Sequence, residues 1–159
     1  HCSAALVGEQ ASGTVHYSWP LAEDGSYTFW LYGDPYDATI AKEDGTEVTE
    51  QVYEAHNLTL LLGGDRNPMG QGVRVNQVKY MLVRSEDTPK YDIEIEGESV
   101  SVHFDKIWYC QKGKQGLVIA LRDGYFYVGL CDCNKPEQQT PLCAKGLATA
   151  AYWVHGADE

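Results

Sequence analysis

The chain has 159 residues and a mass of 17.7 kDa, the usual size of one domain with its own hydrophobic core. Hydrophobic residues make up 43% of it and aromatic residues 11%, which excludes a disordered chain, and no apolar run is long enough to span a membrane. The net charge of −11 at pH 7 excludes a general affinity for nucleic acid, because phosphates bind basic surfaces.

The chain begins with two predicted strands. Residues 3–8 form a short apolar run that ends in a glycine, which is typical of a buried strand. Residues 13–19 predict its partner, across a turn at residues 9–12. Pro20 ends this second strand, because proline cannot donate a hydrogen bond to a sheet.

An acidic hairpin follows. Two alternating runs, residues 37–41 and 46–52, flank a turn that contains Asp44-Gly45, a strong hairpin signal because glycine accepts a positive φ. Much of both faces is polar or acidic, so we expect residues 34–53 to project as an arm and not to join the core.

The next segment has two interpretations. A helix from Thr49 or Glu50 to Leu62 would carry acidic residues in its first turn, where the helix dipole favours them. The leucine-rich run at residues 58–62 is equally compatible with a strand, and the sequence leaves both open.

A basic hairpin is predicted at residues 73–84, hinged at Asn76-Gln77. Alternation places Tyr80, Leu82 and Arg84 on one face of its second strand and the opposite set on the other face. That opposite set is Lys79, Met81 and Val83.

Further strands and one terminal helix complete the pattern. Strands are predicted at residues 91–96, 99–104, 107–110, 117–121 and 125–131, the last two joined by an Asp-Gly turn. Thr140-Pro141 begins a helix, apolar residues recur in it at helical spacing, and Gly156 ends it. The order predicts an α+β domain, an antiparallel sheet with helices packed on its faces.

Cysteine and histidine spacing argues against a metal site or a catalytic centre. The odd number of cysteines, at positions 2, 110, 131, 133 and 143, indicates reduced thiols. Cys131 and Cys133, with Cys143, lack the spacing of a zinc knuckle and have no nearby histidine. The five histidines are scattered, and His103 is interpreted as structural. We therefore expect no metal, no cofactor and no enzymatic activity.

Positive charge is concentrated in the second part of the chain. Residues 1–60 contain ten acidic residues against Lys42 alone, a net charge of 1 − 10 = −9. Residues 61–159 contain eleven basic and thirteen acidic residues, a net charge of 11 − 13 = −2. An acidic protein partner that docks on the second part is therefore compatible with the sequence.

The order of these segments resembles the profilins, small proteins that bind actin monomers. "CSAALVG" is similar to the opening strand of that family, "VTEQVYEAHNLTLLLGGD" to its short helix, "GVRVNQVKYMLVRSED" to its basic hairpin, and "QKGKQGLVIALRDGYFYVGLCD" to its last two strands. The arm, "YGDPYDATIAKEDGTEVTEQV", resembles an insertion of apicomplexan profilins. The resemblance implies one profilin-like domain over residues 1–159, with a central antiparallel sheet packed by a C-terminal helix and a short inner helix.

The resemblance also implies a function. Profilins cover the barbed-end face of monomeric actin with the C-terminal helix and neighbouring strands, and so regulate filament assembly in the cytoplasm and its cytoskeleton. By position, Lys79 and Arg84 would face acidic parts of actin, with Leu82 between them in sequence. Lys112, Lys114 and Lys145 would extend the same surface. Each of these basic residues alone is also compatible with an ordinary solvated charge.

A second family site, for proline-rich proteins such as formins, would involve His16, Tyr17, Tyr152 and Trp153. Two departures stand against full equivalence. The sequence opens at the first strand, without the family's aromatic N-terminal helix, and "CNKPEQQTPLC" is longer than the family's loop before the last helix. An alternative is therefore a profilin-fold structural subunit of a larger assembly, with degenerate actin and polyproline sites.

Overall fold

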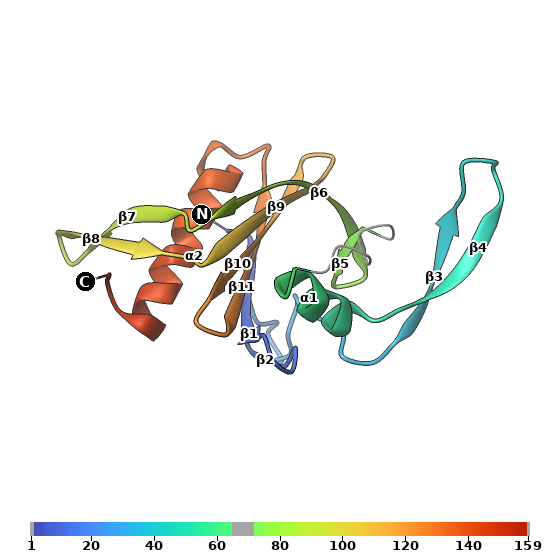
Figure 1. Cartoon of the computed structure of the whole chain (residues 1–159), viewed down its shortest axis with the longest axis horizontal. Helices are drawn as coiled ribbons and strands as arrows, with labels where there is room; N and C mark the ends of the chain where they lie inside the picture. The colour runs from blue at the N-terminus through green and yellow to red at the C-terminus, as the bar shows by residue number, and fades with distance from the viewer. Residues whose placement is uncertain (1, 65–71, 159) are drawn as a thin grey trace.

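The computed structural model of the chain describes residues 2–64 and 72–158 (Figure 1). Within these residues, a seven-stranded antiparallel sheet has the order β2-β1-β11-β10-β9-β6-β5. The strands are β1 (Ala4–Glu9), β2 (Val15–Trp19), β5 (Val73–Val75), β6 (Val78–Asp87), β9 (Lys106–Lys112), β10 (Gln115–Arg122) and β11 (Tyr125–Asp132).

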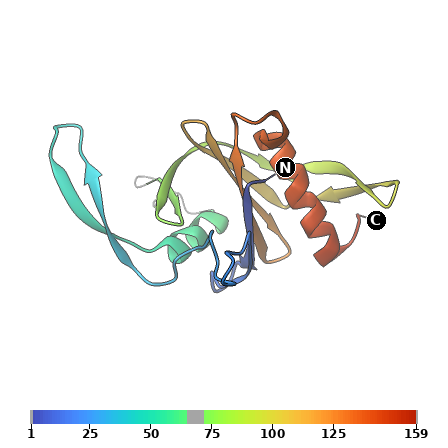
Figure 2. The ribbon, with the colours of Figure 1, turned by 180° about the vertical axis from the view of Figure 1, so that it is seen from behind.

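Different elements cover the two faces of this sheet (Figure 2). One face packs on α1 (Glu54–Leu62), through a core that includes Leu58, Trp108 and Phe126. The other face packs on α2 (Thr140–His155), which follows the short 3-10 helix η2 (Pro136–Gln138), and on the hairpin of β7 (Lys90–Ile95) and β8 (Glu98–His103). The α+β fold predicted from the sequence is therefore confirmed.

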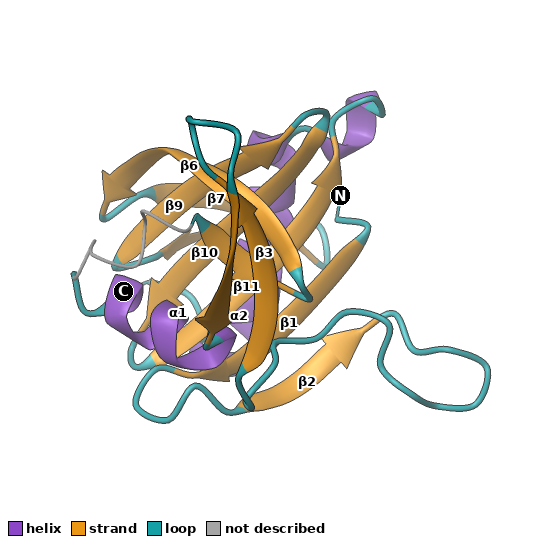
Figure 3. Cartoon of the chain, turned by 90° about the vertical axis from the view of Figure 1, so that its right-hand side faces the viewer, coloured by secondary structure: helices purple, strands orange, loops and turns teal. Residues whose placement is uncertain are grey.

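The acidic arm consists of β3 (Tyr36–Ala41) and β4 (Glu47–Val52), which extend away from the sheet in Figure 1 and lie in front of it in the view of Figure 3. The two strands form a separate two-stranded sheet. At the turn, Gly45 has a φ of +85°, and Asp44 Oδ1 accepts hydrogen bonds from the backbone N–H and the hydroxyl of Thr46 at 3.0 and 2.6 Å. The Asp-Gly signal of the sequence corresponds to this turn.

The ambiguous segment after the arm is a helix, but it begins later than Thr49 or Glu50. Residues 47–52 pair with β3 as a strand, so α1 starts at Glu54. Residues Glu54, Ala55, Leu58, Leu61 and Leu62 of this helix are buried, at the spacing of one helix face. Burial of this face against the sheet explains why the leucine-rich run is helical.

Glu54 joins three parts of the fold through its buried carboxylate. The side chain is 1% exposed. Its Oε1 accepts the backbone N–H of Tyr32 at 3.2 Å and of Asn76 at 2.9 Å, and its Oε2 accepts the N–H of Gln77 at 2.7 Å and the hydroxyl of Tyr36. Helix α1, the base of the arm and the β5–β6 turn therefore meet at one residue.

The expectation that all five cysteines are reduced is wrong for two of them. Cys2 and Cys143 form a disulfide, with their Cα atoms 5.0 Å apart. Cys2, two residues before β1, and Cys143, in the first turn of α2, both have their Sγ atoms beside Gly129 of β11. Cys110 and Cys131 are buried thiols, and burial raises the pKa of each to about 12.

Candidate functional site

The basic strand β6 contains a bulge that changes which side chains share a face. Met81 pairs with Gln111 and Leu82 with Cys110, but the register then shifts, so that Arg84 pairs with Tyr109. Gln111 and Tyr109 are two residues apart on β9 and lie on one face, and paired residues of neighbouring strands share that face. The prediction that Arg84 lies with Tyr80 and Leu82 is therefore wrong, and Arg84 lies on the face of Met81.

The Arg84 guanidinium lies over an aromatic ring. Its Cζ is 4.0 Å from the centroid of Tyr109, a cation–π arrangement. The guanidinium also forms an ion pair with Glu86, and this hydrogen bond raises the pKa of Arg84. Arg84 is half exposed, so a partner can reach its charge, but Glu86 offsets part of it.

The apolar residues that β6 exposes are Met81 and Val83, whereas the sequence predicted Leu82 as the apolar residue of the binding surface. Leu82 is half-buried and packs on the core, together with Tyr80. Met81 and Val83 are 58% and 61% exposed. Alternation around the buried Tyr80 was the signal that could have identified Met81. We call Lys79, Met81, Val83 and Arg84 the β6 face.

The other predicted basic residues lie near this face, on two further elements. Lys112 and Lys114 are exposed at the β9–β10 turn, and the Met81–Gln111 pair places the start of β6 at the same end of the sheet. Lys145 is on the exposed side of α2, where it lines an open hollow beside Asp92 and two neighbouring residues of β7. Arg84 and Lys145 both lie on the α2 side of the sheet, and β7 lies next to each of them. Tyr91 of β7 is hydrogen-bonded to Tyr109, the ring under Arg84, and Asp92 of β7 lines the hollow beside Lys145.

Aromatic residues of β2 and α2 flank the same sheet face. Tyr17 pairs with Val7, and Val7 pairs with Tyr127, whose hydroxyl is 2.8 Å from His155 Nε2 at the end of α2. Tyr17 and Trp153 are both exposed. Tyr152 is half-buried, and the exposed His16 has its Nε2 3.2 Å from Glu9 Oε1. Trp19, which is also exposed, was not predicted from the sequence as a site residue.

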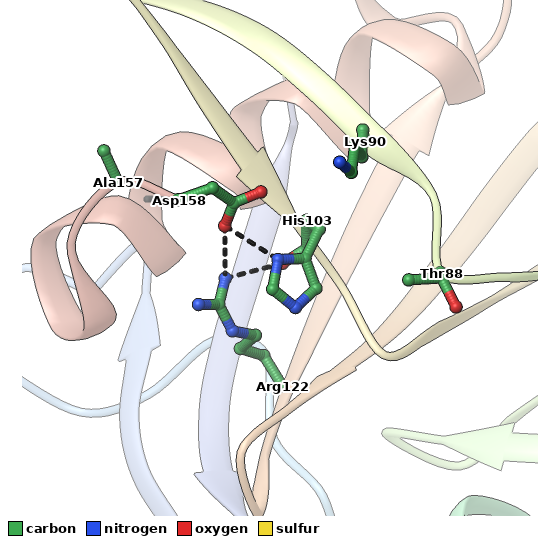
Figure 4. Close-up of a pocket in the computed structure, with 6 residues that line it drawn as sticks. All are labelled: Thr88, Lys90, His103, Arg122, Ala157 and Asp158. Atoms are coloured by element: carbon green, nitrogen blue, oxygen red, sulfur yellow. Dashed lines mark hydrogen bonds and ion pairs between the residues drawn. The ribbon is translucent and has the colours of Figure 1, made fainter.

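A polar cluster lies just beyond the C-terminal end of α2 (Figure 4). His103 Nδ1 is 2.7 Å from Asp158 Oδ1, and His103 Nε2 is 3.8 Å from Asp105. Arg122 is buried and its Nη1 is 3.6 Å from the same oxygen of Asp158. His103 is thus hydrogen-bonded, in agreement with its structural interpretation, but neither Arg122 nor Asp158 was selected from the sequence.

His155 makes stability depend on pH. Burial lowers the pKa of His155, and Arg122 lowers it further. Its folded pKa is therefore below the unfolded value of 6.5, so its contribution to stability is complete above pH 6.5 and is lost as the pH falls through the folded pKa. We expect Tm to fall more steeply between pH 7 and pH 5 in the parent protein than in His155→Gln.

The measurement is thermal unfolding across that pH range. One proton contributes a slope of at most about 1.4 kcal/mol per pH unit. His56→Gln, which alters an exposed histidine on α1, is the control and should keep the parent's pH profile. Identical profiles for the parent and His155→Gln would show that His155 is not the responsible group.

The described part of the chain has neither a group of side chains suited to a metal ion nor a helix suited to spanning a membrane. No group of three or more His, Cys, Asp and Glu side chains in it could hold a metal ion. None of its helices is long and apolar enough to cross a membrane.

Comparison with solved structures places the fold among the profilins. The chain is similar to Schizosaccharomyces pombe profilin, with a TM-score of 0.55 and 14% identity over 97% of this chain and 87% of that one. It is similar to Acanthamoeba castellanii profilin IB, with a TM-score of 0.55 and 12% identity over 98% of this chain and 86% of that one. No protein-family model and no curated protein sequence matches. The chain therefore has a profilin-like fold.

Proposed function

We propose that this protein binds monomeric actin and regulates filament assembly by covering the barbed-end face of the monomer. The observation that carries the proposal is the β6 face, on which two exposed apolar residues, Met81 and Val83, lie beside Arg84 and Lys79 on a profilin-like fold. Apolar contacts supply most of the affinity of such an interface, while the basic residues steer the encounter with an acidic surface.

The charge distribution supports one orientation of the partner. Lys112 and Lys114, exposed at the β9–β10 turn, add positive charge near the start of the β6 face, whereas Lys145 lies beside Asp92 and Glu94. The arm, in contrast, carries six acidic residues within 34–53 against Lys42 alone, and it extends away from the sheet (Figure 1). An acidic partner is therefore attracted to the sheet and repelled by the arm.

The proposal predicts that reversing one charge weakens actin binding. Arg84→Glu removes the cation at the β6 face and places two acids side by side, since Glu86 remains. We expect a loss of about 1–2 kcal/mol, roughly a factor of 10, in affinity for monomeric actin. The measurement is a titration against actin monomers, with pyrene-actin assembly as the functional readout.

Lys42→Glu is the matched control, because it reverses an exposed charge at the tip of the arm. Lys42→Glu should leave the affinity for monomeric actin unchanged or lower it slightly. If the parent protein has no effect on the kinetics of actin assembly, the proposal is wrong. A fixed stoichiometric partner other than actin, found by cross-linking, would instead favour the role of a structural subunit.

A second ligand, a proline-rich segment such as those of formins, is favoured by the aromatic residues on β2 and α2. Flat rings bind a polyproline II helix at little ordering cost. We expect a proline decapeptide to change tryptophan fluorescence, and Trp153→Ala to weaken its binding about tenfold, that is ~1.4 kcal/mol. Tyr53→Ala, which removes an exposed ring beside α1, is the control. No spectral change with the parent protein would count against this site.

A further inference from the structure

A buried arginine forms the floor of a pocket on the α2 side of the molecule. The Arg122 side chain, on β10, is only 9% exposed. Its Nη1 donates to the carbonyl of His103 at 2.7 Å, and its Nε donates to Asp123 at 3.2 Å. A buried guanidinium held in one orientation is suited to recognise a carboxylate.

The segment 156–158, which follows α2, occupies this pocket as a peptide ligand would. Asp158 donates its backbone N–H to the carbonyl of Ser101 on β8 at 2.8 Å. Its carboxylate is 15% exposed and lies 2.7 Å from His103 Nδ1 and 3.6 Å from Arg122 Nη1 (Figure 4). Recognition thus has two parts, a main-chain hydrogen bond to the edge of a hairpin and a carboxylate on two cationic or N–H-donating side chains.

Few contacts hold this segment in place. Gly156, with a φ of +83°, turns the chain away from the helix and donates its N–H to Tyr152. Beyond that bond, the hydrogen bonds and ion pairs of the segment within the described residues are those of Asp158. A segment with so few bonds opens at a low free-energy cost.

The pocket also offers donors that Asp158 does not use. A hollow of about 370 Å³ remains beside it and is lined by Lys90 and Thr88 (Figure 4). Within the described residues, neither the Lys90 ammonium nor the Thr88 hydroxyl has a hydrogen-bond or ion-pair partner. A larger acidic ligand can therefore make contacts that the chain's own segment leaves unmade.

We propose that this pocket is a binding site for an acidic peptide segment, and that residues 156–158 are its internal occupant. A carboxylate of the partner peptide takes the place of Asp158 on His103 and Arg122, and its neighbouring polar groups bond to Lys90 and Thr88. Because the internal occupant competes, the apparent affinity of the intact protein is lowered by the fraction of time that the pocket is filled. The proposal is independent of actin binding.

The test compares the parent protein with Asp158→Ala. The probe is an acetylated and amidated tetrapeptide, His-Gly-Ala-Asp, which copies residues 155–158. Binding is followed by two-dimensional NMR of the ¹⁵N-labelled protein, with peptide concentrations up to about 10 mM to reach weak affinities. We expect the peptide to shift the amide signals of Ser101 and His103, and to bind Asp158→Ala about tenfold more tightly than the parent if the segment fills the pocket nine-tenths of the time.

Two controls distinguish recognition of the carboxylate from non-specific peptide binding. A peptide with asparagine in place of the aspartate should bind Asp158→Ala at least about tenfold more weakly. Lys90→Ala, added to Asp158→Ala, should weaken severalfold the binding of a longer peptide that carries a second acidic residue, whereas Lys135→Ala, at an exposed position in the loop before α2, should not. Both lysines are exposed, so these variants test the site without removing the buried Arg122.

Three results would overturn the proposal. Absence of binding to Asp158→Ala over the whole concentration range would show that the pocket does not accept a separate ligand. Equal affinity for the parent and Asp158→Ala would show that the segment is not a competitor. Equal binding of the acidic and asparagine peptides would show that the carboxylate is not what the pocket recognises.

Discussion

Replacing Glu54 with glutamine is expected to lower the free energy of unfolding by about 3 kcal/mol and Tm by roughly 6–12 °C. The carboxylate accepts hydrogen bonds from three backbone N–H groups and from the Tyr36 hydroxyl. Glutamine has one acceptor oxygen, so its NH2 group faces donors and leaves at least one buried N–H without a partner. Thermal and urea unfolding measure the loss.

Two further variants serve as controls for the size of this effect. Glu47→Gln removes an exposed acid from β4, a short distance along the chain, and should change stability by less than about 0.5 kcal/mol. Tyr36→Phe removes one of the four donors and should cost about 1 kcal/mol. If Glu54→Gln unfolds at the parent's midpoint, the carboxylate does not join α1, the arm and the β5–β6 turn as described.

Gly8→Ala is the second substitution with a large expected effect. A Cβ at Gly8 would overlap with the ring of Phe126 and with the backbone carbonyl of Thr14. Thr14 cannot move freely, because its carbonyl accepts the N–H of Glu9 at 2.9 Å and closes the β1–β2 turn. We expect a loss of about 3 kcal/mol in the free energy of unfolding, at the upper end of overpacking effects.

The control is a glycine with space around it. A Cβ at Gly33 would meet no atom within 4 Å, and the backbone there does not need a positive φ. Gly33→Ala should therefore be neutral or stabilise the protein by a few tenths of a kcal/mol, about what the loss of unfolded-state entropy contributes. Chemical denaturation of both variants measures the change in the free energy of unfolding. Equal denaturation midpoints for Gly8→Ala and Gly33→Ala would mean that β1 and β11 move apart enough to accept a methyl group at Gly8.

Local signals predicted much of the fold. The Asp-Gly turns predicted the hairpins β3–β4 and β10–β11, and Thr140-Pro141 with Gly156 predicted the ends of α2, because these residues act on the backbone next to them. The start of α1 was predicted too early, since strand pairing with β3 overrides the helical preference of residues 49–52. The disulfide could not be predicted, since its cysteines are 141 positions apart.

The sequence predicted the basic residues of the candidate site but not which face of β6 each of them occupies. Lys79 and Arg84 were selected from the sequence, yet strict alternation puts them on opposite faces, and only the bulge before Arg84 brings them together. A bulge adds one residue to a strand and leaves no pattern in the sequence. Asp158, His103 and Arg122 come from three separate elements, so their contact depends on tertiary packing alone.

The Cys2–Cys143 bond makes a covalent ring of nearly the whole molecule. The arm, helix α1 and every strand of the sheet belong to that ring. A protease that cuts once at the tip of the arm would therefore leave the two pieces covalently joined, and denaturing electrophoresis would separate them only after a reductant opened the bond.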